Sequence, residues 1–168
     1  MTWELRPPGR ADIAAIARLD QEGFEGYRSF APPDWEPPTQ EEEVDWLGRR
    51  LFDPAVWCLL AEDEHGPAGH VAFMPAALAR RASNEADLAH LWLLFVRPSR
   101  WGSGLASELH ARALEEAARR GFTAMRLFTP TGQARARRFY EREGWKVAGE
   151  PFDDAEFGLE LVEYRRGL

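Results

Sequence analysis

The sequence predicts an α/β fold in which helices flank one mixed β-sheet. Two observations carry this prediction. Segments of strand length alternate with segments of helical periodicity, and an early hairpin precedes a strand–helix–strand–helix unit. With 168 residues, of which 45% are hydrophobic and 12% aromatic, the chain suits a single domain spanning residues 1–168. The expected order of elements is β-α-α-β-β-β-α-β-α-β-β.

The N-terminal part is expected to hold one short strand and a helix. Trp3 and Leu5 alternate with polar residues, and Asp12 is a residue type that caps the helix predicted to follow it. The proline-rich segment 31–38 is incompatible with a helix or a central strand, so we expect a stiff connection there.

The second helix is predicted to begin at Thr39. Glu42 stands three residues later, as in a capping box, and apolar residues then recur at helical spacing as far as Leu51. Residues 41–43 are all glutamate, and negative charge in a first turn suits the helix dipole. These glutamates are therefore expected to form a solvated helix end.

The middle of the chain is predicted to form three strands. Residues 56–62 and 68–74 flank a turn that ends at Gly66, which indicates a hairpin. The polar stretch 79–87 is expected to be a loop. Residues 88–96 are almost continuously apolar, which is typical of a central strand.

The C-terminal part alternates helices with strands. A helix is predicted over 103–120, a strand over 124–128 and a second helix over 131–143. Two further strands, at 145–147 and 159–164, are predicted around a loop rich in aspartate and glutamate.

Composition excludes several classes of function. The net charge of −7 and the pI near 5.2 argue against nucleic acid or an anionic membrane as the partner, because both require a basic surface. No segment is long enough to span a bilayer, and the N-terminus lacks an apolar signal core. The single cysteine, Cys58, lies in an apolar run and is expected to be buried, which fits a reducing compartment. We therefore expect a cytoplasmic protein, and no metal site is predicted.

Residues 96–106 form the most informative local pattern. The predicted strand ends at Val96, and Gly102 and Gly104 follow before the next helix. The N–H groups of a helix's first turn lack internal partners and the dipole adds positive charge, so such a junction suits a phosphate. The glycines also remove the Cβ atoms that would keep a ligand away from the backbone.

Two common phosphate-binding motifs do not fit this junction. A P-loop requires Gly-Lys-Ser/Thr after its glycines, and no such sequence follows Gly104. A dinucleotide-binding fold places its glycines after the first strand of a repeated parallel unit, whereas here they follow the fourth predicted strand.

Two motifs together resemble the GCN5-related N-acetyltransferase (GNAT) family. They are V-x-P-x-x-x-G-x-G-L-A over residues 96–106 and, after a helix and a strand, A-R-R-F-Y-E-R-E-G-W over residues 136–145. The resemblance covers most of the chain and is strongest over 88–146. It implies a GNAT-type acyl-CoA N-acyltransferase fold with acetyl-CoA as the cosubstrate.

By position, the resemblance implies a cofactor site. The glycine loop would wrap the pyrophosphate through its backbone, and the end of the preceding strand would pair with the pantetheine arm like an added strand. Trp101 replaces the family's usual Gln or Arg. Arg100 or Arg97 would then supply the charge, and the alternative is that these arginines are solvated surface residues. Gln133 takes the place of an Asn that hydrogen-bonds the pantetheine. The residues implied in cofactor binding are Leu94, Phe95, Val96, Arg100, Trp101, Gly102, Ser103, Gly104, Leu105, Ala106, Ser107, Gln133 and Tyr140.

The resemblance also implies catalytic roles. Tyr140 would protonate the departing thiolate, since a phenol with a pKa of about 10 stays protonated at neutral pH. His90 takes the position of a strand glutamate that acts as general base, and imidazole can accept a proton near neutral pH. Two alternatives remain, a core histidine without a catalytic role or a solvent channel that needs no dedicated base. Weaker candidates for the base are Asp87, Glu25, Asp153 and Asp154.

The implied activity is transfer of an acetyl group from acetyl-CoA to a primary amine of a small molecule or peptide, by direct attack in a ternary complex. Aromatic and acidic residues at 23–35 and 153–157 are expected to bind the acceptor, which suits an amine with an apolar body. The alternative is a non-catalytic acyl-CoA-binding or regulatory module, because the strand glutamate is absent. Homodimers are common among relatives, and the apolar C-terminal strands would permit one.

Overall fold

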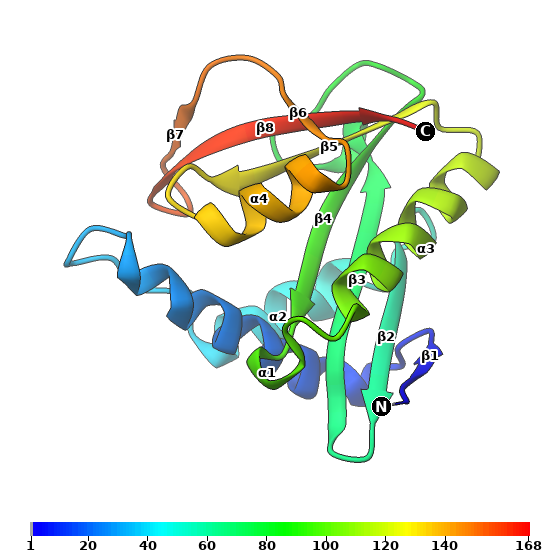
Figure 1. Ribbon diagram of the computed structural model, residues 1–168, viewed down its shortest axis with the longest axis vertical. Helices are drawn as coiled ribbons and strands as arrows, with labels where there is room; N and C mark the ends of the chain where they lie inside the picture. The colour runs from blue at the N-terminus through cyan, green and yellow to red at the C-terminus, as the bar shows by residue number, and fades with distance from the viewer. Residues whose placement is uncertain (1) are drawn as a thin grey trace.

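The computed structural model describes residues 2–168 and contains one eight-stranded mixed sheet with helices on both faces (Figure 1). The strand order is β1-β2-β3-β4-β5-β8-β6, and β7 also pairs with β8. Only the β4–β5 pair is parallel within this part of the chain. The predicted α/β class with a mixed sheet is therefore confirmed.

The elements follow the predicted order closely. The strands and α-helices are β1 (Glu4–Arg6), α1 (Ile13–Glu25), α2 (Gln40–Arg50), β2 (Trp57–Asp63), β3 (Gly66–Pro75), β4 (Leu88–Val96), α3 (Leu105–Arg119), β5 (Ala124–Pro130), α4 (Ala134–Arg142), β6 (Lys146–Val147), β7 (Phe152–Asp154) and β8 (Leu159–Gly167). The strand β7 lies inside the acidic segment that was expected to be a loop. Short 3-10 turns occur at Arg10–Asp12, Gly26–Ser29, Ala76–Leu78 and Pro98–Arg100.

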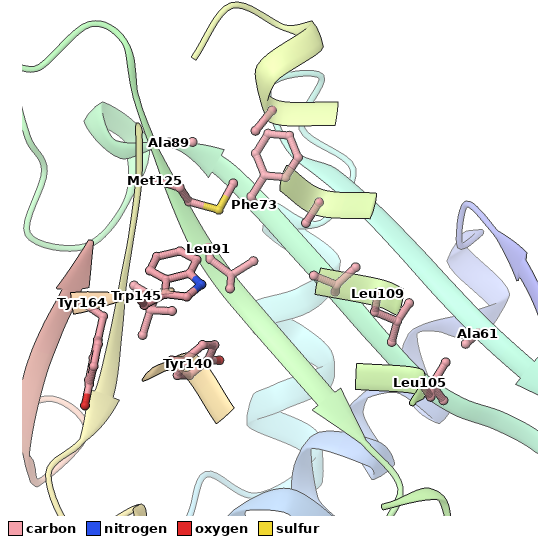
Figure 2. Packing of buried hydrophobic residues seen from close by; sticks show 14 of the residues in the cluster. Ala61, Phe73, Ala89, Leu91, Leu105, Leu109, Met125, Tyr140, Trp145 and Tyr164 are labelled. Carbon is pink, nitrogen blue, oxygen red and sulfur yellow. The ribbon is translucent and has the colours of Figure 1, made fainter. Parts of the chain in front are cut away.

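The two faces of the sheet carry different helices. α3 and α4 pack on one face, where Leu105 and Leu109 of α3 belong to the same apolar cluster as Phe73 and Leu91 of the sheet (Figure 2). α1 and α2 cover the other face through a second apolar cluster that includes Leu47. Each strand alternates its side chains between these two layers, as expected for a sheet buried on both sides.

The sheet opens between β4 and β5. These two strands pair only over Leu88–His90 and Ala124–Arg126, and beyond that point they diverge (Figure 1). The pairing of β3 with β4 shifts register between Ala72 and Phe73, which leaves Trp92 as an extra residue in β4. Such a β-bulge bends its strand, and it lies at the start of the opening.

Two local predictions were wrong in detail. Asp12 is the N-cap residue of α1 but makes no side-chain capping hydrogen bond, because its carboxylate accepts a hydrogen bond from the Gly9 N–H and pairs with Arg6 at 2.8 Å. The capping box of α2 is present as predicted, with Thr39 and Glu42 exchanging hydrogen bonds. However, Glu43 in the same turn is buried rather than solvated.

Candidate functional site

The free edge of β4 is the first component of the candidate site. The Arg97 N–H donates to the Ala68 carbonyl of β3 at 2.8 Å. Because backbone groups alternate sides along an antiparallel strand, those of Phe95 also face β3, and those of Leu94 and Val96 face the opening. Leu94 and Val96 can therefore pair with an extended ligand, whereas Phe95, expected to do the same, contributes only its side chain to the opposite face.

The loop before α3 is the second component. Gly102 and Gly104 have φ of 79° and 91°, in the left-handed region that favours glycine. A Cβ at either position would meet no protein atom within 4 Å, so the space above the loop is open. The helix itself begins at Leu105, two residues later than the sequence predicted.

Several N–H groups of this loop are available to a ligand. Across residues 2–168, no acceptor is found for the N–H groups of Gly102, Gly104, Ala106 and Ser107. They cluster at the N-terminus of a fifteen-residue helix, where the dipole adds partial positive charge. This arrangement can hold an anion without any charged side chain.

Arg100 connects the loop to the end of β2 through an ion pair. Its Nε lies 2.5 Å from Oδ2 of Asp63, which also lies 2.8 Å from Nη2 of Arg97. The carboxylate of Asp63 is buried between the two guanidinium groups, and the Arg100 side chain is itself buried. The geometry therefore makes Arg100 a positioning residue for the loop and disfavours the side-chain contact with phosphate that was expected of it.

The remaining predicted cofactor residues lie around the same opening. The Ser103 hydroxyl donates to the Arg100 carbonyl at 2.6 Å, and the Ser107 hydroxyl donates to Glu143 at 3.0 Å. Both hydroxyls therefore have protein partners already. Gln133 is the N-cap residue of α4, and its side-chain amide makes no hydrogen bond within residues 2–168.

Trp101 is partly exposed and has two contacts. Its indole Nε1 donates to the Val96 carbonyl at 2.9 Å, and the guanidinium carbon of Arg135 lies 3.6 Å from the centroid of its ring. Sequence reasoning did not identify Arg135. The only signal was its place near the start of α4, in the basic segment Ala134-Arg135-Ala136-Arg137-Arg138.

Tyr140 lies on α4, facing β4 (Figure 2). Its ring packs against Trp145 and Tyr164, with centroids 5.8 and 6.2 Å away. Burial, with a smaller contribution from Tyr27, raises the pKa of the Tyr140 phenol well above its ordinary value. The hydroxyl makes no hydrogen bond within the described chain, so a protonated donor remains free to serve a ligand.

His90 lies on the opposite face of the sheet from Tyr140. Its Nδ1 accepts a hydrogen bond from Arg126 Nε at 3.3 Å, and its ring packs on Phe128. Burial, together with the charges of Arg126 and Arg80, lowers the pKa of His90 to about 3. His90 is therefore neutral at neutral pH with its Nδ1 lone pair in use. This environment disfavours the general-base role and fits the alternative of a core histidine.

The other base candidates are also engaged or remote. Glu25 pairs with Arg28 at 2.7 Å, Asp154 pairs with Arg80 at 3.0 Å, and Asp87 accepts a hydrogen bond from Thr123 at 2.5 Å. Asp153 is exposed on β7. None of the base candidates that the sequence offered is thus a clear base at the opening between β4 and β5.

The segment between α1 and α2 meets the β7–β8 hairpin in an aromatic cluster. The Trp35 indole donates to the Phe157 carbonyl at 2.9 Å, and the Phe157 ring lies 5.6 Å from that of Phe24. Beside this cluster lies a pocket of about 500 Å³. Its lining comprises Phe30, Pro32, Pro130, Thr131, Gly132, Asp153, Asp154, Ala155, Gly158, Leu159 and Glu160.

Residues 2–168 contain no group of three or more His, Cys, Asp and Glu side chains placed to hold a metal ion. The same residues include no helix with the length and apolar character needed to cross a membrane.

Known proteins resemble this chain in sequence and in fold. It is 30% identical over 161 residues to a mycothiol acetyltransferase of Beutenbergia cavernae, covering 84% of this chain and 52% of the relative. The chain thus spans about half the length of that protein.

Two solved structures share the fold. YncA from Salmonella typhimurium, solved with acetyl-CoA, has a TM-score of 0.74 at 20% identity and covers 99% of this chain and 94% of its own. The PaiA N-acetyltransferase of Thermoplasma acidophilum, solved with coenzyme A, has a TM-score of 0.68 at 16% identity, covering 97% and 98%.

The family assignment rests on the sequence itself. Residues 16–145 match the acetyltransferase (GNAT) family, a range that includes the glycine loop, Tyr140 and the free edge of β4. The expected resemblance is therefore confirmed, and this chain belongs to the acetyltransferase (GNAT) family.

Proposed function

We propose that this protein transfers an acetyl group from acetyl-CoA to a primary amine by direct attack in a ternary complex. The observation that carries the proposal is the set of unpaired N–H groups at Gly102, Gly104, Ala106 and Ser107, beside the free edge of β4. The N–H groups suit a pyrophosphate, and the free strand edge suits the two amides of a pantetheine arm.

Tyr140 is proposed as the acid. The amine nitrogen attacks the thioester carbonyl carbon, and the carbon–sulfur bond then breaks to release CoA thiolate. The thiolate takes the phenolic proton of Tyr140, and the nitrogen gives up its proton, through water, to the phenolate. The Tyr140 hydroxyl, which makes no hydrogen bond within the described residues, supports this role, and the raised pKa keeps the phenol protonated until the thiolate leaves.

We propose no side chain as the base that would deprotonate the acceptor ammonium before attack. His90 is a weak base in its buried site, and the carboxylates near the acceptor side are engaged or exposed. An acceptor amine that reaches the site in its neutral form needs no base. Its reaction rate should rise with pH toward the pKa of the amine in solution.

The acceptor is proposed to enter through the pocket beside Phe30. Asp153, Asp154 and Glu160 line this pocket, and carboxylates at an entrance attract ammonium groups. This supports a small-molecule or peptide amine as acceptor. The name of the Beutenbergia cavernae relative supports acetyl as the transferred group.

A non-catalytic acyl-CoA-binding module is the second candidate, and the lack of a clear base favours it. Single-turnover release of CoA from bound acetyl-CoA, measured with a panel of amines, separates the two functions. The enzyme releases CoA faster with at least one amine. The binding module binds acetyl-CoA in a calorimetric titration but shows no acceleration with any amine.

The variant Tyr140→Phe tests the acid. It should lower kcat at least about a hundredfold, the low end of the contribution of a general acid, while leaving the affinity for acetyl-CoA nearly unchanged. Tyr164→Phe is the matched control, since it removes a phenolic hydroxyl from the same apolar cluster. The Tyr164 hydroxyl donates to Glu141 at 2.8 Å. Equal kcat in wild type and Tyr140→Phe would contradict the acid role.

A further inference from the structure

Trp101 and Arg135 connect the two walls of the opening between β4 and β5. Trp101 belongs to the loop that precedes α3, and Arg135 lies in the first turn of α4. The Arg135 guanidinium carbon lies 3.6 Å from the centroid of the Trp101 ring, well inside the range of a cation–π interaction. The pair therefore bridges the opening on the side where the cofactor is proposed to bind.

The indole also forms a hydrogen bond with a backbone carbonyl that the cofactor is proposed to use. Trp101 Nε1 donates to the Val96 carbonyl at 2.9 Å. That carbonyl lies on the outward edge of β4, where the pantetheine arm is proposed to pair. In this conformation the indole N–H takes the place of a pantetheine amide.

Neither contact is held by the packed core. Trp101 keeps 47% of its surface exposed, although large apolar side chains are mostly covered in this protein. Arg135 is exposed, and within residues 2–168 it makes no ion pair. The indole is thus retained by one surface cation–π contact and one hydrogen bond, so it can leave without disrupting the core.

We propose that the Trp101 indole covers the free edge of β4, that its cation–π contact with Arg135 holds this cover in place, and that acetyl-CoA displaces it on binding. The inference rests on the proposed acetyl-CoA site. A ligand that requires the open state binds with an apparent affinity reduced by the open fraction. Removing the cover should therefore accelerate binding.

Stopped-flow measurement of acetyl-CoA binding tests the cover. Trp101→Ala should raise the association rate constant by about five- to seventyfold, the range that one surface cation–π contact and one hydrogen bond allow. Arg135→Gln should also raise it, although loss of a positive charge alone slows association with an anion.

Arg138→Gln is the matched control. It removes the same charge from α4, and Arg138 makes no contact with Trp101. It should leave the rate unchanged or lower it. An adenosine bisphosphate fragment that lacks pantetheine provides a second control, because it does not require the edge of β4 and should bind wild type and Trp101→Ala at equal rates.

The outcomes are separable. If acetyl-CoA still binds and its association rate constant is unchanged in both Trp101→Ala and Arg135→Gln, the proposed cover is wrong but the proposed function stands. The same is true if the fragment gains as much as acetyl-CoA. Absence of acetyl-CoA binding in wild type and in Trp101→Ala overturns the proposed function itself. Unfolding midpoints close to that of wild type would show that these surface variants are folded.

Discussion

His70 Nε2 lies 2.5 Å from Asp20 Oδ1, and both side chains are completely buried between α1 and β3. The second atoms of these groups, Asp20 Oδ2 and His70 Nδ1, make no hydrogen bond within residues 2–168, and neither does Oε1 of Glu43 on α2. The His70 ring also stacks on Phe95, with centroids 5.9 Å apart. A polar cluster thus joins both helices to the sheet directly behind the free edge of β4.

Glu43 should make stability depend on pH. Burial and the neighbouring Asp20 carboxylate raise the pKa of Glu43 from 4.5 to about 8, with a smaller contribution from Glu42. The folded state therefore keeps a proton that the unfolded chain loses from about pH 4.5 upward. The stability that this proton contributes is fully present below the unfolded pKa and is lost as pH rises to about 8. The free energy of unfolding falls by at most about 1.4 kcal/mol per pH unit in this range.

Urea denaturation between pH 5 and pH 9 measures this dependence. Glu43→Gln removes the titrating group, so its free energy of unfolding should fall less steeply with pH than that of wild type. Glu41→Gln is the control, because Glu41 lies in the same turn but is exposed. Parallel pH profiles for wild type and Glu43→Gln would show that Glu43 does not control the slope.

The Asp20–His70 contact should be strongly coupled. Asp20→Asn leaves a buried imidazole without its carboxylate, and His70→Gln leaves a buried carboxylate without its imidazole. Each should lower the free energy of unfolding by about 3–5 kcal/mol, the usual cost of separating a buried pair. The double variant should lose less than the sum of the two. Additive losses in denaturant titrations would mean that the two side chains act independently.

This cluster also marks the limit of sequence reasoning about the fold. The capping box of Thr39 and Glu42 could be predicted because both partners lie within one turn. The burial of Glu43 could not, because it depends on Asp20 and His70, which other elements bring beneath α2. The Asp12 cap failed for the same reason, since Arg6 on the neighbouring strand competes for its carboxylate.

The candidate site divides in the same way. The glycine loop and the free edge of β4 follow from residue order, since a strand, two glycines and a helix are consecutive. The stacking of Arg135 on Trp101 joins α4 to the loop before α3, and no local pattern encodes their approach. His90 had a suitable side chain for a base, but its burial and Arg126 on the adjacent strand lower its pKa, and neither follows from the local sequence.

Gly104→Val should abolish acetyl-CoA binding. The residue has a φ of 91° and opens onto the space above the loop, so a branched side chain both strains the backbone and fills the proposed pyrophosphate site. Calorimetric titration measures the loss. Gly149→Val is a matched control, because Gly149 has a φ of 86°, also faces open space and lies between β6 and β7.

Both glycine variants should lose a similar stability, about 1–2 kcal/mol for a β-branched residue in the left-handed region. Only Gly104→Val should lose affinity for acetyl-CoA. If the two variants bind acetyl-CoA equally well, the loop before α3 does not hold the pyrophosphate.

Trp35 should control the acceptor side without affecting the cofactor side. Its indole N–H donates to the Phe157 carbonyl at 2.9 Å and so ties the α1–α2 segment to the β7–β8 hairpin, beside the pocket proposed for the acceptor. Trp35→Phe keeps an aromatic ring in the cluster but leaves that carbonyl without its donor, at a cost of about 1–3 kcal/mol in the free energy of unfolding. The acceptor KM should rise severalfold, because both walls of the pocket become more mobile.

The acetyl-CoA affinity should stay within twofold of wild type, because Trp35 lies among the aromatic residues packed against α1, away from the glycine loop. Steady-state kinetics with the best amine and calorimetry with acetyl-CoA measure the two sides separately. Equal weakening of both would mean that the aromatic cluster supports the whole opening between β4 and β5 rather than the acceptor side alone.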